Sequence, residues 1–229
     1  MTNIYRMKAK FSTDLALAVG GSDDLPLIEL SYNVRRGEGK NFQLSMYQRV
    51  KMKPPKLAAE LVLRKEDFDF DYFQWGPTVL VSERMRQVMA LDAATARYLE
   101  VDSSRSAPLP RSKNYKILEP EADEDVSDLE RSEYEMVQFM PGLPSTPSLY
   151  GHLVVRTDTE PRHELFYDAF FTADIFCTEA FALRVLRAGC TGVEFGVLNE
   201  GEHRLCRTLR GIERVRGYDE ARQEIMELV

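Results

Sequence analysis

The sequence predicts an α+β fold in which mixed sheets carry a few helices and a strand-cap-helix-strand unit occurs twice. The first observation is a short apolar strand, a capped amphipathic helix and a second strand between residues 79 and 101. The second is the same order of features between residues 175 and 197. The third is an N-terminal region whose apolar residues alternate as they do in strands. The hydrophobic fraction of 44% is typical of a globular protein.

Strands are predicted for most of the N-terminal region. Residues 4–9 alternate weakly between apolar and polar side chains. A hairpin is predicted over 27–47, where a Gly-Glu-Gly turn separates two alternating segments. The apolar segment 56–64 follows two prolines, and its pattern leaves the choice between helix and strand open.

The first strand-cap-helix-strand unit begins with a buried strand at 79–81. Ser82 is the predicted N-cap of the following helix, and Glu83 places a negative charge in its first turn, where the helix dipole favours it. Residues 98–101 form the closing strand. One face of the helix is apolar and consists of Met85, Val88 and Met89.

The second unit has strands at 175–177 and 193–197, with Thr178 as the predicted N-cap. A constant offset of 96 residues relates the two units. The matched pairs are Ser82 and Thr178, Glu83 and Glu179, Met85 and Phe181, Thr95 and Thr191, Leu99 and Phe195, and Val101 and Val197. An internal repeat explains these matches, although two unrelated amphipathic units would share some of them.

The chain is predicted to have two halves and a connector. Residues 1–115 form an N-terminal α+β half, 116–148 an acidic and Pro-rich connector, and 149–229 a C-terminal α+β half. Short strands are expected at 113–118 and 149–156, and whether the halves share one core stays open.

The C-terminal region combines a basic stretch with a predicted helix. Residues 219–228 have the spacing of an amphipathic helix. Residues 204–216 contain five arginines and one glutamate, so they could bind phosphate. A solvated helix face or an intramolecular partner for the acidic connector is the favoured interpretation.

The sequence predicts a cytoplasmic protein that does not enter a membrane. The N-terminal apolar run at 15–19 is too short for a signal peptide, and no run approaches the roughly 18 apolar residues of a membrane helix. The three cysteines are odd in number and form no CxxC pair, as expected in a reducing compartment.

Motifs for catalysis, cofactors or metals are not apparent in the sequence. The three histidines, His152, His163 and His203, have no metal-binding spacing, and there is no GxSxG elbow or phosphate-binding glycine loop. Cys177 is expected to be a small buried apolar residue. We therefore predict no catalytic residue, no metal ligand and no cofactor, and a protein that is not an enzyme.

The segment 67–73 alternates carboxylates with aromatic residues. On a strand, its three carboxylates would share one face and the aromatic side chains the other. Three interpretations follow: a half-buried strand with a polar outer face, an acidic docking face for a basic partner, and a divalent cation site.

The middle of the chain is strongly acidic. Residues 67–135 hold 16 Asp and Glu against 8 Lys and Arg, and 119–135 hold nine carboxylates against one arginine. Such a surface repels nucleic acid and accelerates the approach of a basic protein. A surface that merely keeps the protein soluble is the alternative.

Three segments resemble immunity family eleven of the bacterial polymorphic toxin systems. They are the runs YFQWGPTVLVSERM at 72–85, ADIFCTEAF at 173–181 and AGCTGVEF at 188–195. The resemblance rests on the helix start Val-Ser-Glu-Arg and the closing strand Thr-Gly-Val-x-Phe. It implies an inhibitor without catalytic residues, made beside its toxin gene, that blocks a cognate toxin protein by tight docking.

The acidic segments at 67–71 and 119–135 are then the candidate contacts with the toxin, because carboxylates would suit the basic cleft of a nuclease. A general scaffold module and a metal-dependent enzyme that uses the carboxylates at 67–71 are the competing interpretations. The candidate partner-binding residues are Asp67, Asp69, Asp71, Glu121, Asp123, Glu124, Asp125 and Asp128.

Overall fold

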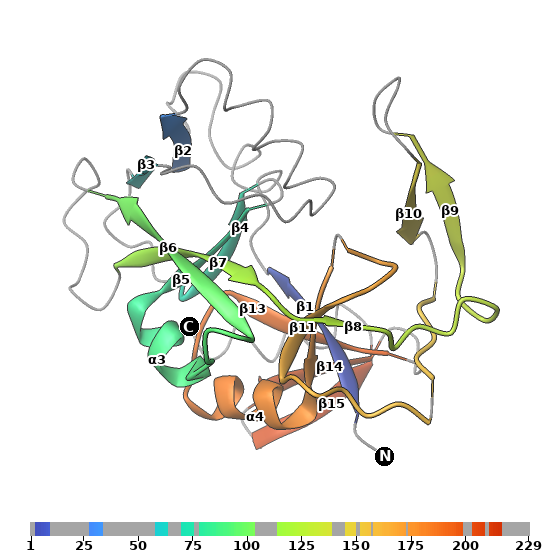
Figure 1. The fold of residues 1–229 in the computed structure, drawn as a ribbon. Helices are drawn as coiled ribbons and strands as arrows, with labels where there is room; N and C mark the ends of the chain where they lie inside the picture. The colour runs from blue at the N-terminus through green and yellow to red at the C-terminus, as the bar shows by residue number, and fades with distance from the viewer. Residues whose placement is uncertain are drawn as a thin grey trace, which may run out of the picture.

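The computed structural model describes residues 3–9, 28–33, 58–63, 70–75, 78–103, 114–138, 145–149, 152–156, 158–172, 174–198, 203–208 and 211–216. Within these residues the chain forms mixed sheets and the helices α3 (Glu83–Met89) and α4 (Glu179–Arg187), as Figure 1 shows. The predicted α+β class is confirmed. Neither of these helices is long and apolar enough to cross a membrane.

One mixed sheet has the strand order β2-β3-β6-β7-β5-β4. Neighbouring strands are antiparallel except β3 and β6, which are parallel. The strands are β2 (Ile28–Asn33), β3 (Ala58–Leu63), β4 (Tyr72–Trp75), β5 (Thr78–Ser82), β6 (Ala96–Asp102) and β7 (Tyr115–Pro120).

The other mixed sheet has the order β15-β14-β13-β1-β12-β11-β8. Its strands are β1 (Ile4–Ala9), β8 (Asp123–Glu124), β11 (Leu165–Asp168), β12 (Ile175–Thr178), β13 (Val193–Val197), β14 (His203–Thr208) and β15 (Gly211–Arg216). A separate two-stranded ribbon consists of β9 (Tyr134–Val137) and β10 (Thr146–Leu149), and it projects beside the sheets in Figure 1.

The two sheets share one topology around their helices. In each sheet a strand leads into a helix, and the strand after the helix returns parallel to the first with one antiparallel strand between them. The intervening strand is β7 in one sheet and β1 in the other. We call β4, β5, α3, β6 and β7 the first unit, and β11, β12, α4, β13 and β1 the second unit. The predicted repeat is confirmed, and each unit is a split βαβ motif.

The strand pairing corrects part of the 96-residue offset. Residues that face one another across each central strand are Val79, Leu118 and Tyr98 in the first unit, and Ile175, Met7 and Phe195 in the second. Val79 and Ile175 are 96 apart, whereas Tyr98 and Phe195 are 97 apart. The predicted matches in the closing strand are therefore wrong by one residue, because the stretch from the N-cap to the closing strand is one residue longer in the second unit, where α4 has nine residues and α3 has seven.

Both helices begin where the sequence predicts. The Ser82 Oγ accepts a hydrogen bond from the Met85 amide at 3.1 Å, and the Thr178 Oγ1 accepts one from the Phe181 amide at 3.4 Å. Each hydroxyl satisfies an amide that has no partner inside the helix, so both residues are true N-caps.

The two units share one hydrophobic core. One cluster of buried side chains draws on both sheets and both helices, so both units contribute to it, and a second cluster includes Ile4, Phe166 and Phe176 of the second unit. The members of the shared cluster include Tyr72, Val81 and Met85 from the first unit and Cys177, Phe181 and Phe195 from the second. The buried Cys177 confirms its predicted role as a small apolar residue.

The division into two halves and a connector stays a prediction. The predicted boundary between residues 115 and 116 runs through β7, the central strand of the first unit. Downstream of it, β8 pairs in parallel with β11. Residues 152–156, predicted as part of a strand, contain only an isolated bridge between Val155 and Ser127, so that strand prediction is wrong.

The structure shows strands in two further segments. The segment 56–64 contains strand β3, and the basic stretch 204–216 forms the hairpin of β14 and β15 in place of a helix face. The predicted strand at 42–47 and the predicted helix at 219–228 lie outside the described residues.

Candidate functional site

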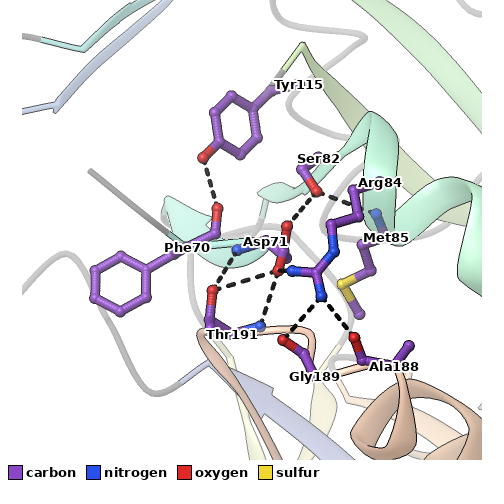
Figure 2. A network of polar contacts seen from close by, with 9 residues as sticks. All are labelled: Phe70, Asp71, Ser82, Arg84, Met85, Tyr115, Ala188, Gly189 and Thr191. Carbon is purple, nitrogen blue, oxygen red and sulfur yellow. Dashed lines mark hydrogen bonds and ion pairs between the residues drawn. The ribbon is translucent and has the colours of Figure 1, made fainter. Parts of the chain in front are cut away.

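Asp71 lies at the centre of a polar network between the two units (Figure 2). Its side chain is fully buried at the bend that precedes β4. The carboxylate accepts hydrogen bonds from the Ser82 Oγ at 2.7 Å, the Arg84 Nη1 at 2.8 Å and the Thr191 amide at 3.0 Å. A buried carboxylate is stable only with such partners. Asp71 therefore links the two units in the interior, and we call Asp71 with Ser82, Arg84 and Thr191 the Asp71 joint.

Arg84 extends this joint to the second unit. Its Nη2 donates to the carbonyl oxygens of Ala188 at 2.5 Å and Gly189 at 3.2 Å, just beyond the end of α4. The carbonyls at a helix C-terminus have no intrahelical partners and carry the negative end of the helix dipole. The guanidinium therefore neutralises Asp71 and caps α4 at the same time.

A second joint, formed by Arg184 and Glu164, links the second unit to the helix of the first in the same way. Arg184 on α4 pairs with Glu164, at 2.6 Å between Nη2 and Oε2. Its guanidinium also donates to the carbonyl oxygens of Val88 at 3.2 Å and Met89 at 2.9 Å, at the end of α3. Each helix thus carries an arginine that caps the helix of the other unit.

Asp71 and Glu164 occupy equivalent positions in the repeat. The carbonyl oxygen of Asp71 accepts from the Ser82 amide at 2.8 Å, and that of Glu164 accepts from the Thr178 amide at 3.0 Å. Each acid therefore contacts the N-cap residue of its own unit through its backbone and the arginine of its own helix through its side chain.

The turn before β13 completes the Asp71 joint. The Thr191 carbonyl oxygen accepts from the amides of Asp71 and Tyr72, at 3.0 and 3.1 Å. Gly192 follows with φ of +81°, and a Cβ at this position would lie 2.2 Å from the Tyr72 carbonyl oxygen. Only glycine tolerates both the left-handed backbone and this close approach.

The segments that meet at this joint are those on which the resemblance rests, namely the helix start at 81–84 and the closing strand at 191–195. The model of the Immunity protein family (Imm11) matches residues 27–200, which is more than half of the chain. The chain belongs to this family. No curated protein matches it. In this Imm11 chain, the two motifs hold the units together by burying Asp71 between them.

Two of the predicted contact residues, Asp67 and Asp69, lie outside the described residues. The third carboxylate of that segment, Asp71, faces the interior, and β4 begins only at the next residue. Its oxygens are occupied by an arginine, a hydroxyl and an amide, an environment that disfavours a divalent cation. The described residues contain no group of three or more His, Cys, Asp or Glu side chains placed to hold a metal.

The second predicted group, in the acidic connector, lies along β8 and the turn that follows it. Glu121, Asp123 and Asp125 are exposed, and Asp128 is half-buried. Asp125 pairs with Arg156 at 3.0 Å, with 72% of its side chain exposed. These carboxylates form an acidic surface beside β11.

Glu124 differs from its neighbours because it points inward. Its side chain is nearly buried and accepts hydrogen bonds from the amides of Arg162 at 3.0 Å and His163 at 3.2 Å. The His163 ring Nδ1 lies 2.6 Å from the same carboxylate oxygen. Glu124 therefore ties β8 to the segment that leads into β11.

Asp168 is an organising residue that sequence reasoning did not identify. It is fully buried at the end of β11, and one carboxylate oxygen accepts from the amides of Val126 at 3.2 Å and Ser127 at 3.1 Å. The other oxygen accepts from the amides of Phe170 and Phe171. Only the fold brings these amides together, so the acidic segment is held in a defined path.

Nucleophile chemistry finds little support in the described residues. The Cys177 thiol is buried in the core, and burial raises its pKa well above the usual range, so the thiolate is disfavoured. Burial of the side chain, with a smaller contribution from its hydrogen bond to Glu179, raises the pKa of Tyr5 to about 12.

Proposed function

We propose that this chain neutralises a cognate bacterial toxin by binding it and covering its active surface. The observation that carries this proposal is the family match over residues 27–200. In the proposed role the protein acts in the cytoplasm, by docking and without catalysis of its own.

The docking face in this proposal is the acidic surface of the exposed Glu121, Asp123 and Asp125 with the half-buried Asp128. The buried Asp71 and Glu124 would hold the fold that displays it, and Asp67 and Asp69 are further candidates. An acidic face of this kind speeds encounter with a basic protein through long-range attraction. A nuclease is the toxin class that fits best, because carboxylates can take the place of phosphates in a basic cleft.

The first experiment is co-purification of this protein with the product of the adjacent reading frame. Growth of cells that express this product is then compared with and without the immunity protein. Rescue of growth together with a stable complex is the expected result. Toxicity that this protein does not relieve, or the absence of a complex, would contradict the proposal.

A matched pair of charge reversals tests the docking face. Asp125 and Glu100 are both exposed, each in an ion pair, with Arg156 and Lys116 respectively. Asp125→Lys is expected to slow association with the toxin roughly tenfold at low salt, and the loss should shrink as salt is added. Glu100→Lys, on β6, changes the net charge equally and should have a smaller effect. Equal effects would show that net charge alone matters.

A further inference from the structure

Most carboxylates of the acidic stretch, residues 119–135, have partners inside the protein. Glu119 and Glu121 pair with Arg97, Asp128 lies 3.8 Å from Arg131, and Glu133 accepts from the His152 amide at 3.1 Å. Among the described residues of this stretch, the side chains of Glu130 and Glu135 form no ion pair or hydrogen bond. These two carboxylates are free to meet a partner.

Each free carboxylate adjoins an exposed apolar side chain. Leu129, next to Glu130, is 38% exposed, and Met136, next to Glu135, is 53% exposed. They are the large hydrophobic side chains that the described residues leave exposed. Apolar side chains with charged neighbours are typical of a protein interface, where an apolar centre has a polar rim.

The ribbon of β9 and β10 has one entirely apolar face. Tyr134 and Met136 lie on the same side of β9, since alternate residues of a strand share a face. Their cross-strand partners are Leu149 and Pro147, which lie directly opposite and so on the same face. The ribbon is therefore amphipathic, although it belongs to neither large sheet.

Among the described residues, the hydrophobic cluster that contains Phe170 and Phe171 covers only the inner half of this apolar face. Tyr134 makes edge-to-face contacts with Phe170 and Phe171, with ring centroids 5.2 and 5.6 Å apart, and Leu149 packs against the same cluster. The outer pair of Met136 and Pro147 lies beyond that cluster. Figure 1 shows the ribbon projecting beside the sheets.

A ribbon whose outer half the described residues leave open is a place for a partner. Two-stranded hairpins are marginally stable alone and gain from packing on an apolar surface. Pro147 has no amide hydrogen, so strand addition along β10 would lack a hydrogen bond there. Docking onto the apolar face is the mode that this ribbon favours.

We infer that the outer half of the ribbon, Met136 with Pro147 and flanked by Glu135, inserts into an apolar hollow with a basic rim on the toxin. This inference rests on the proposed function and specifies where the partner binds. The charge of the surrounding stretch, nine carboxylates against one arginine, selects a basic partner. Leu129 and Glu130, in the turn before β9, extend the contact.

Methionine oxidation tests the contact with internal controls. Met136 is exposed, whereas Met85 and Met89 are fully buried. Mild peroxide should oxidise Met136 in the free protein and spare the buried pair. In the complex with the adjacent reading frame's product, Met136 oxidation should fall to the level of Met85 and Met89. Unchanged oxidation of Met136 in a stable complex would overturn the inference and leave the proposed function intact.

A pair of variants separates apolar contact from charge. Met136→Ala is expected to weaken toxin binding at least about tenfold through faster dissociation, as loss of a central contact does. Glu135→Gln should mainly slow association at low salt. Neither side chain packs in the core, so the melting temperature should stay unchanged. Tight binding by Met136→Ala would contradict the inference, whereas failure of the wild-type protein to bind would overturn both proposals.

Discussion

The two units differ in how the turn after the helix is stabilised. In the first unit, Asp92 stabilises its own turn by accepting a hydrogen bond from the Thr95 amide at 2.8 Å. In the second unit the amide of Thr191, in the turn before β13, donates to Asp71, which precedes β4 of the first unit. The first turn is therefore self-sufficient, whereas the second depends on its neighbour.

The helix starts differ in the same sense. Glu83 is held by residues of its own helix, with Arg86 at 2.5 Å, and this hydrogen bond lowers the pKa of the Glu83 carboxyl. Glu179, its match in the second unit, accepts from the Tyr5 hydroxyl at 3.0 Å and lies 3.7 Å from Arg214. Residues distant in sequence thus build the second unit, which makes it the one that long-range changes should damage most.

Gly192→Ala is expected to have the largest effect on stability. The new Cβ would meet the Tyr72 carbonyl oxygen at 2.2 Å in a left-handed backbone, a combination that should cost about 4 kcal/mol. Gly196→Ala is the matched control on β13, because its Cβ would find its nearest neighbour at 3.7 Å. Urea unfolding measures both. Similar losses would show that the close approach at Gly192 does not matter.

Asp71→Ala should come next, with a loss of about 3 kcal/mol, since it leaves buried donors without an acceptor. Glu164→Ala removes the equivalent acid, but that side chain is 43% exposed, and the loss should stay below about 1 kcal/mol. Chemical denaturation of both variants compares the two joints directly. A larger loss for Glu164→Ala would reverse this ranking.

The N-caps provide a finer comparison. The Ser82 hydroxyl caps α3 and also donates to Asp71, whereas the Thr178 hydroxyl, among the described residues, only caps α4. Ser82→Ala should therefore cost about 2 kcal/mol and Thr178→Ala about 1 kcal/mol. Thermal unfolding of the two variants checks the order, and equal losses would indicate that the bond to Asp71 adds nothing.

The smallest expected effect is on the pH dependence of stability, through Tyr5 on the central strand β1. Tyr5 on β1 corresponds to Lys116 on β7, and burial with the Glu179 hydrogen bond raises the Tyr5 pKa from 10.0 to about 12. The unfolded state loses this proton first, so the contribution of Tyr5 is present below pH 10 and is lost as the pH rises to about 12. Tyr5→Phe should flatten the decline of stability over this range. An unchanged slope in urea melts between pH 9 and 11.5 would contradict this role.

Much of the secondary structure was predictable because it depends on local chemistry. The N-caps at Ser82 and Thr178, the strands around them and the repeat itself follow from side chains within a few residues of each other. The family was also accessible, because the resemblance to it rests on the continuous segments 72–85, 173–181 and 188–195.

The partners of the acidic residues were not predictable from local pattern. Asp71 alternates with aromatic side chains as an exposed strand residue would, yet it is buried because Arg84 and Thr191 surround it. Asp168 likewise gains two of its donors, the amides of Val126 and Ser127, from a segment 42 and 41 residues away, and the Arg162 amide that donates to Glu124 is 38 residues away. Burial of a charge is decided by which donors reach it, and that is a property of the assembled chain.

The sequence by itself determined the α+β class, the two helix starts and the duplicated unit, because capping and periodicity act over one or two turns of chain. Only the tertiary structure decided that β1 and β7 complete the two units, that arginines cap the helices reciprocally, and which carboxylates remain free. Those features join residues such as Arg84 and Gly189, 105 positions apart. Contacts over that distance form only when the shared core brings the two units together.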